Sequence, residues 1–237
     1  MKDLVNSLIA VKKVGLLDCR VPNDHIESLY TINTLRQRNL IREDETVQHF
    51  ITKVLRILLN PSPHILKNVI DFSRSHFDHK TVLGIQIRTG GCVANFQELK
   101  SMMSIQEIRQ FPSYINNIMS KELLRIDNTV IFLSTDSDLV EEYIREQLNN
   151  DIDIITANIY KRSHSRGKAS EESISGALLD TLLLARADVL ITCSGSGFGR
   201  VANTISLSRR KYIYNTTHTL NKFYNKGLRK CNEIPIL

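Results

Sequence analysis

The sequence predicts an α/β protein with a Rossmann-like, mostly parallel sheet over residues 81–237 and a mainly helical part over residues 1–80. From Thr81 onward, short apolar segments alternate with helical segments, a pattern typical of a parallel sheet covered by helices on both faces. Before that point, apolar residues recur at helical spacing instead. The 237 residues are 42% hydrophobic and 24% charged, values typical of a globular protein that buries a substantial core.

Two helices are expected in the N-terminal part. Residues 46–60 place apolar side chains at helical spacing, and this segment ends at Asn60-Pro61. A second helix is expected to begin near Pro63, because proline is tolerated where the backbone N–H has no intrahelical partner. Residues 1–45 show no regular alternation of strands and helices.

The C-terminal part contains five expected strands, at residues 82–87, 129–134, 152–156, 189–192 and 211–214. Helices are expected between them, within residues 104–122, at residues 137–148, through Asp180, and after Gly197. In such sheets ligands bind beyond the carboxyl ends of the strands, so the segments that follow the strands are the candidate site.

Four polar segments follow the strands: residues 88–91 (Arg-Thr-Gly-Gly), residues 135–137 (Thr-Asp-Ser), a basic loop at 161–168, and residues 194–197 (Ser-Gly-Ser-Gly). An arginine, an acid, further cations and a glycine-serine turn would then meet at one edge. This set suits a nucleotide that carries a diphosphate.

Arg88 is the first candidate, because a guanidinium offers planar, bidentate donors to phosphate oxygens. The alternative is a structural arginine that pairs with Asp136 or another acid at the same edge. Spacing alone favours Asp136 as the N-cap of the helix that begins near Asp138, although Thr135, Ser137 and Asp138 are equally good cap residues.

The turn at Ser194, Gly195, Ser196 and Gly197 connects a strand to a helix, and backbone N–H groups at a helix N-terminus bind anions. These serines could instead only end the strand and cap the helix. Asp180 lies at the rim of an apolar helix face and needs a partner. Arg186 or Lys168 could pair with it, or it could reach a base or ribose.

Several functions are not supported by the sequence. It contains no P-loop, no G-x-G-x-x-G after the first strand, and no metal-dependent Asp-x-Asp motif after an apolar strand. The four cysteines form no C-x-x-C pair, so free thiols are expected and a metal is not. The net charge of +6 is spread along the chain, so no nucleic-acid partner is expected, and no membrane contact is expected either.

Four separated segments resemble the donor-binding half of GDP-fucose-dependent fucosyltransferases, the superfamily of the α1,6-, xyloglucan α1,2-, nodulation-factor and protein O-fucosyltransferases. The segments are residues 58–63 (Leu-Leu-Asn-Pro-Ser-Pro) leading into 83–88 (Leu-Gly-Ile-Gln-Ile-Arg), residues 130–137 (Val-Ile-Phe-Leu-Ser-Thr-Asp-Ser), residues 178–180 followed by 187–193, and residues 194–202 with their Arg-Val-Ala. Their order and spacing are more specific than any one segment.

The resemblance covers about residues 50–215 and implies a GT-B glycosyltransferase that transfers fucose from GDP-fucose, with inversion and without a metal or other cofactor, to a glycan or protein hydroxyl. It implies that Arg88 grips the diphosphate and is the catalytic residue, and that Asp180 reads guanine. The turn at residues 194–197 would meet phosphate. Gln86 and Asp136 would lie in the donor site.

The sequence also departs from the family pattern. Gln86 and a single Arg88 stand where the α1,6 type has a histidine and an arginine pair, and Glu98 is the nearest acid that could act as general base. About 80 residues before Val82 are too few for a complete acceptor-side half, so the chain is either a fragment or carries a reduced helical cap.

Two alternatives to the fucosyltransferase stay open: the same fold with another nucleotide sugar, and a nucleotide-sugar-binding module or inactive remnant. The compartment is also open: the Golgi or endoplasmic-reticulum lumen for a fragment of an anchored eukaryotic enzyme, and otherwise the cytoplasm.

Overall fold

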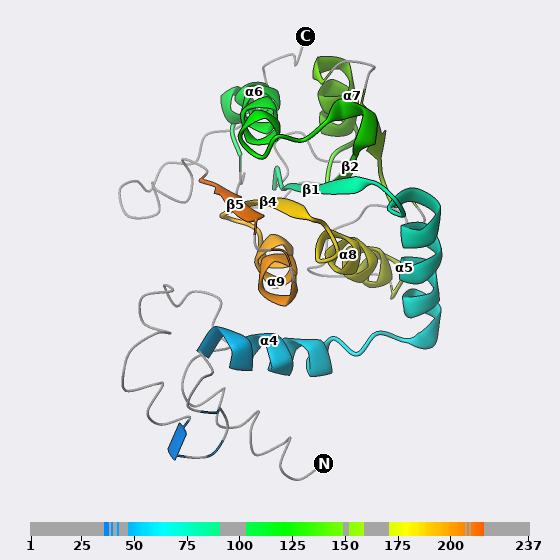
Figure 1. Ribbon diagram of the computed structural model, residues 1–237, viewed down its shortest axis with the longest axis vertical. Coiled ribbons are helices and arrows are strands. Elements are labelled where there is room, and N and C mark those ends of the chain that lie inside the picture. Colours follow the sequence, from blue (N-terminus) through cyan, green and yellow to red (C-terminus); the bar gives the residue numbers. More distant parts are fainter. Residues whose placement is uncertain are drawn as a thin grey trace. The chain divides into compact units, whose positions relative to one another are not determined.

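The protein is described by a computed structural model that covers residues 36–37, 39, 42, 47–90, 103–148, 152–158, 171–206, 208 and 210–215 (Figure 1). The chain divides into two compact units, residues 1–60 and 61–237. In the first unit, the structure describes the amphipathic helix α4 (Val47–Leu58). The second unit holds the sheet and the helices that cover it.

The sheet contains five parallel strands in the order β3-β2-β1-β4-β5. Their bounds are β1 (Thr81–Ile87), β2 (Thr129–Thr135), β3 (Asp153–Ile155), β4 (Val189–Cys193) and β5 (Arg210–Tyr214). The helices of this unit are α5 (Pro63–His76), α6 (Ile105–Lys121), α7 (Asp138–Gln147), α8 (Glu171–Leu184) and α9 (Gly197–Ile205), with the short 3-10 helix η1 (Ile126–Asn128) before β2. The α/β class with a Rossmann-like parallel sheet is therefore confirmed.

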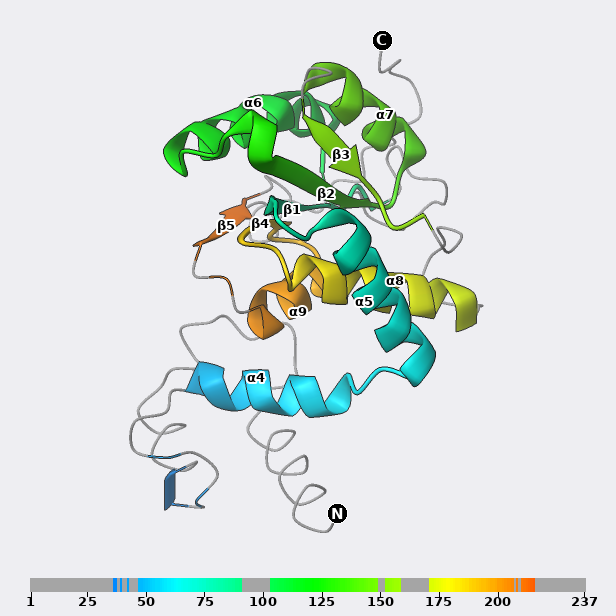
Figure 2. The ribbon, with the colours of Figure 1, turned by 45° about the vertical axis from the view of Figure 1, so that its right-hand side comes forward.

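Helices cover both faces of the sheet, α6 and α7 on one face and α5, α8 and α9 on the other (Figures 1 and 2). Alternate residues of each strand face opposite sides, so Ile85 packs with Phe111 of α6 while Phe132 packs with Leu183 of α8. Phe132 also makes an edge-to-face contact with Phe77, which follows α5. The buried strands read as continuous apolar runs because both faces are covered.

Polar side chains cap the N-termini of several helices. Ser104 and Glu107 form a reciprocal capping box at the start of α6. Ser62 accepts a hydrogen bond from the Ile65 N–H, and Pro63 opens α5 as expected. These local signals agree with the expected start of a helix near Pro63 and with the helix expected within residues 104–122.

The predicted strands differ from the observed ones by at most one residue at either end. Helix α5 packs its Ile65 and Val69 into the core on the α8 side of the sheet, and it belongs to the second unit. The domain boundary expected near residue 80 stays a prediction. Among the helices that the structure describes, none is long and apolar enough to cross a membrane.

The strand order reverses between β1 and β4. From β1 the chain proceeds outward to β2 and β3 through α6 and α7, and it then returns through α8 to add β4 and β5 on the other side. The carboxyl ends of β1 and β4 flank this switch point, which is where open α/β sheets bind their ligands.

Candidate functional site

The switch point brings together two segments that the sequence predicts to bind a ligand. Arg88 follows β1, and Ser194 follows β4, the strand that pairs with β1 in parallel. Asp136 follows β2 on the other side of β1. The expectation that these strand ends meet at one edge is therefore correct for the described residues.

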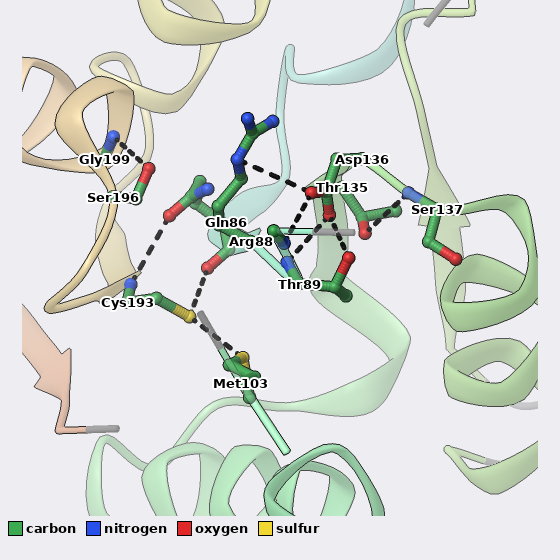
Figure 3. Close-up of polar contacts among 11 residues, drawn as sticks. Gln86, Arg88, Thr89, Met103, Thr135, Asp136, Ser137, Cys193, Ser196 and Gly199 are labelled. Atoms are coloured by element: carbon green, nitrogen blue, oxygen red, sulfur yellow. Dashed lines mark hydrogen bonds and ion pairs between the residues drawn. The ribbon is translucent and has the colours of Figure 1, made fainter. Parts of the chain in front are cut away.

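Asp136 holds the segment after β1 (Figure 3). Its Oδ1 accepts hydrogen bonds from the Thr89 N–H at 2.8 Å and from the Thr89 hydroxyl at 2.9 Å. Its Oδ2 accepts from the Gly90 N–H at 3.0 Å and lies 3.5 Å from Arg88 Nε. Gly90 has a φ of 69°, a left-handed conformation that glycine adopts without strain.

The interpretation of Asp136 as the N-cap of the following helix is wrong. Ser137 caps α7, because its Oγ accepts a hydrogen bond from the Val140 N–H. The carboxylate of Asp136 turns instead toward the buried Thr89 and Gly90 N–H groups, which need an acceptor. Spacing could not separate the neighbouring cap candidates, because the competing donors come from the segment after β1, which is distant in the sequence.

Arg88 is mostly buried, with 17% of its side chain exposed. Its Nε faces Asp136, and the two terminal nitrogens of the guanidinium point away from that carboxylate (Figure 3). The pairing with Asp136 that the sequence offered as an alternative is thus present. It leaves the outer edge of the guanidinium directed elsewhere, so both interpretations of Arg88 are compatible with this geometry.

Gln86 joins β1 to β4 at the point where their pairing ends. Its Oε1 accepts a hydrogen bond from the Cys193 N–H at 3.4 Å, and Cys193 Sγ contacts the Gln86 carbonyl oxygen at 3.2 Å. Gln86 packs so closely against α9 that a Cβ on Gly199 would lie 2.6 Å from Oε1. Burial raises the pKa of the Cys193 thiol to about 12, so this cysteine is a protonated packing residue at neutral pH.

The turn after β4 is partly used by the fold itself. The Ser194 N–H donates to the Tyr214 carbonyl, and the Ser196 N–H donates to the Cys193 carbonyl. Ser196 is the N-cap of α9 and accepts from the Gly199 N–H at 3.1 Å, as one of the two interpretations expected. Within the part of the chain that the structure describes, the N–H groups of Gly195, Gly197 and Phe198 have no hydrogen-bond partner, and a Cβ on Gly197 would meet nothing within 4 Å.

Asp180 lies on α8 and is half-buried, with a partner that the sequence did not suggest. The Ser134 hydroxyl near the end of β2 donates to Asp180 Oδ2 at 2.7 Å. Ser134, Gln86 and Thr192 are in register across β2, β1 and β4. This polar row faces α8 and α9, and its signal in the sequence is one polar residue just before the end of each apolar strand.

Two predicted features lie outside the described residues: Glu98, the candidate general base, and the basic loop at 161–168. Thr89 and Ser134 are the residues whose roles sequence reasoning missed. Among the described residues, no group of three or more histidine, cysteine, aspartate or glutamate side chains could hold a metal ion.

The fold and the site define a Rossmann-like α/β domain whose switch point presents an arginine and a helix N-terminus, a combination suited to an anionic ligand. The chain belongs to the nodulation protein Z (NodZ) family, whose model matches residues 43–217. The resemblance found in the sequence is thereby confirmed at the level of the family. A comparison with curated proteins gives no match.

Solved structures with similar folds include fucosyltransferase NodZ from Bradyrhizobium, at 20% identity over 61% of this chain and 42% of that chain, with a TM-score of 0.42. A NodZ α-1,6-fucosyltransferase co-crystallized with GDP has 17% identity over 79% of this chain and 61% of that chain, with a TM-score of 0.45. A mutant of FUT1 from Arabidopsis thaliana in complex with GDP has 18% identity over 65% and 33%, with a TM-score of 0.42. The chain thus spans less than two thirds of the length of each of these three proteins.

Proposed function

We propose that the protein is a glycosyltransferase of the GT-B type that binds GDP-fucose at the switch point and transfers fucose to a hydroxyl group of a glycan or protein. The observation that carries the proposal is Arg88 at the end of β1, opposite the N-terminus of α9 across the β1–β4 switch point. Family membership supports GDP-fucose as the donor, since crystals of a NodZ α-1,6-fucosyltransferase have been soaked with GDP-fucose.

The proposed reaction is a displacement at the anomeric carbon of fucose. The acceptor oxygen forms the new bond to that carbon, the bond to the diphosphate oxygen breaks, and the configuration inverts. GDP leaves with the bonding electrons, so negative charge grows on the diphosphate. Arg88 and the N–H groups of Gly195 and Gly197 supply positive charge at that place, which lowers the barrier without a metal.

The acceptor's proton must pass to a base during this reaction. Glu98 is the candidate given by its position in the sequence, a few residues beyond Arg88. Asp136 is a poor candidate, because its carboxylate is buried and already accepts three hydrogen bonds.

Calorimetric titration with GDP, GDP-fucose, UDP and ADP, each in the presence of EDTA, tests the donor and the absence of a metal together. We expect GDP and GDP-fucose to bind at least about tenfold more tightly than UDP or ADP. The reason is that the Asp180 carboxylate, which we propose contacts the base, distinguishes guanine from the other bases. EDTA should change neither affinity. Preference for UDP or ADP would contradict the donor, and a requirement for manganese would contradict the metal-free mechanism.

A further inference from the structure

The carboxylate of Asp136 is enclosed by its own chain. Thr89 contributes two hydrogen bonds, the Gly90 N–H contributes a third, and Arg88 Nε contributes an ion pair at 3.5 Å. Only 4% of the Asp136 side chain is exposed. A carboxylate has about four lone-pair positions, so these contacts use nearly all of its capacity to accept hydrogen bonds.

A direct contact between Asp136 and a nucleotide diphosphate is therefore disfavoured. Both groups are anions, and the hydrogen-bond donors and the cation that stabilise the Asp136 charge come from the segment after β1 and not from a ligand. Burying a charged group also costs free energy unless the group is paired and hydrogen-bonded. The contacts with Thr89, Gly90 and Arg88 meet this need. The arrangement joins the end of β2 to the segment after β1 across two adjacent strands.

Arg88 is the residue through which this arrangement can act. Its Nε faces Asp136, and the outer edge of the guanidinium, with the two terminal nitrogens, points away (Figure 3). A guanidinium can bind a carboxylate along one edge and a phosphate along another, because its donors lie in one plane. A long side chain held at Nε loses less rotamer entropy when it binds a ligand.

We propose that Asp136 is a positioning residue that fixes the direction of the Arg88 guanidinium and the conformation of the Thr89–Gly90 backbone, so that Arg88 is preorganised for the diphosphate. This inference rests on the proposed function, in which Arg88 binds that diphosphate. Asp136 itself then contacts no ligand. Substitution of Asp136 should therefore weaken the binding of the phosphates of a nucleotide and not the binding of its base.

The test compares GDP with guanosine, which lacks phosphates, in calorimetric titrations of Asp136→Asn. Asparagine keeps the size and one acceptor but removes the charge that holds Arg88. We expect GDP affinity to fall about tenfold or more, since Arg88 is no longer held in the direction of the phosphates, while guanosine affinity changes less than about twofold. Equal losses for both ligands would contradict the proposal, because they indicate a general structural effect.

A double-mutant cycle with Arg88→Lys shows whether Asp136 acts through Arg88. Lysine lacks the planar fork, so it cannot bind the carboxylate and the phosphate along two edges. Asp136→Asn should then cost GDP affinity less than about twofold further in the Arg88→Lys background. A full tenfold loss in that background would overturn the proposal, because Asp136 would be acting independently of Arg88.

Two further variants complete the design. Thr89→Val removes the hydrogen bond from the Thr89 hydroxyl to Asp136 Oδ1 and keeps both charges. We expect a smaller loss of GDP affinity than in Asp136→Asn and an unchanged guanosine affinity. Thr89→Val serves as the test if Asp136→Asn does not fold. Asp127→Asn is the matched control, an exposed aspartate paired with Arg125, and it should leave GDP affinity unchanged. Failure of the native protein to bind GDP would contradict the proposed function instead, whereas full GDP affinity in Arg88→Lys would contradict the role of the planar guanidinium.

Discussion

The hydroxyl of Ser134 donates a hydrogen bond to Asp180 Oδ2 at 2.7 Å, which ties the end of β2 to the middle of α8. The contact fixes one carboxylate oxygen of a half-buried acid close to the carboxyl edge of the sheet. A carboxylate held in this way is suited to accept the two adjacent donors of a guanine ring, the N1 hydrogen and the 2-amino group.

Asp180→Asn is expected to remove the preference for guanine. The native protein should bind GDP about tenfold more tightly than inosine diphosphate, whose base lacks the 2-amino group, because an unmatched polar group lowers affinity by that order. In Asp180→Asn, GDP affinity should fall and the ratio between the two nucleotides should shrink to about twofold. Competition titrations with both nucleotides measure this ratio.

Two controls accompany that measurement. Ser134→Ala keeps the Asp180 carboxylate, so we expect a smaller loss of GDP affinity with the guanine preference retained. Asp71→Asn changes an exposed aspartate that pairs with Lys67 on α5, and it should change nothing. An unchanged ratio in Asp180→Asn would show that another group selects the base.

Gly199→Ala should destabilise the fold, whereas Gly197→Ala should not. A Cβ at Gly199 would lie 2.6 Å from Gln86 Oε1 and 3.2 Å from Thr192 Cβ, so Gln86 would have to release the Cys193 N–H. We expect Gly199→Ala to lower the free energy of unfolding by about 1–3 kcal/mol, as overpacking does. At Gly197 the new methyl group meets nothing within 4 Å, so a change within about 0.5 kcal/mol is expected. Urea unfolding of both variants compares them, and equal stabilities would contradict the close packing of α9 against β1.

The buried Cys193 thiol predicts a loss of stability in alkali. Burial raises its pKa to about 12 in the folded protein, whereas an unfolded cysteine ionises near pH ~8.5. The folded state therefore holds the proton more tightly, and its contribution is complete below about pH 8.5 and lost as the pH rises toward about 12. The free energy of unfolding should fall by up to about 1.4 kcal/mol per pH unit from this thiol alone.

Urea unfolding measures this slope in the native protein and in Cys193→Ala. The measurements run from about pH 8.5, the pKa of the unfolded thiol, to about pH 10. The alanine variant should be less stable at about pH 8.5 because it leaves a cavity, but its slope with pH should be shallower. Burial also raises the pKa values of Tyr114 and Tyr214, and these contribute in both proteins. Parallel curves for the two proteins would contradict a buried, protonated thiol.

The sheet was predictable because its signal is local. Each strand is a short apolar run that is followed by a polar or glycine-rich segment. In β1 and β2, nearly every residue is buried, on both faces of the sheet. The strand ends then located the site, because parallel strands place their carboxyl ends at one edge. Arg88 and the turn at 194–197 were found in this way.

The partners within the site were less predictable because they depend on register and side-chain direction. Ser134 meets Asp180 only because β2 turns that side chain toward α8, and Asp136 meets Thr89 only because β2 lies directly beside β1. Spacing alone favoured Asp136 as a cap of α7, but two backbone N–H groups after β1 bind its carboxylate. A pattern along one segment does not contain such contacts between distant segments.

Calorimetric titration of Arg88→Ala with GDP tests most directly whether Arg88 binds the diphosphate of GDP. Arg125→Ala, which removes an exposed arginine paired with Asp127, is the matched control. We expect the control to bind GDP as the native protein does, and Arg88→Ala to lose affinity by about 100-fold or more, the order expected when a buried charge-assisted contact is removed. Thermal unfolding of Arg88→Ala should show that its fold persists. Native GDP affinity in a folded Arg88→Ala protein would show that this arginine serves the fold and not the ligand.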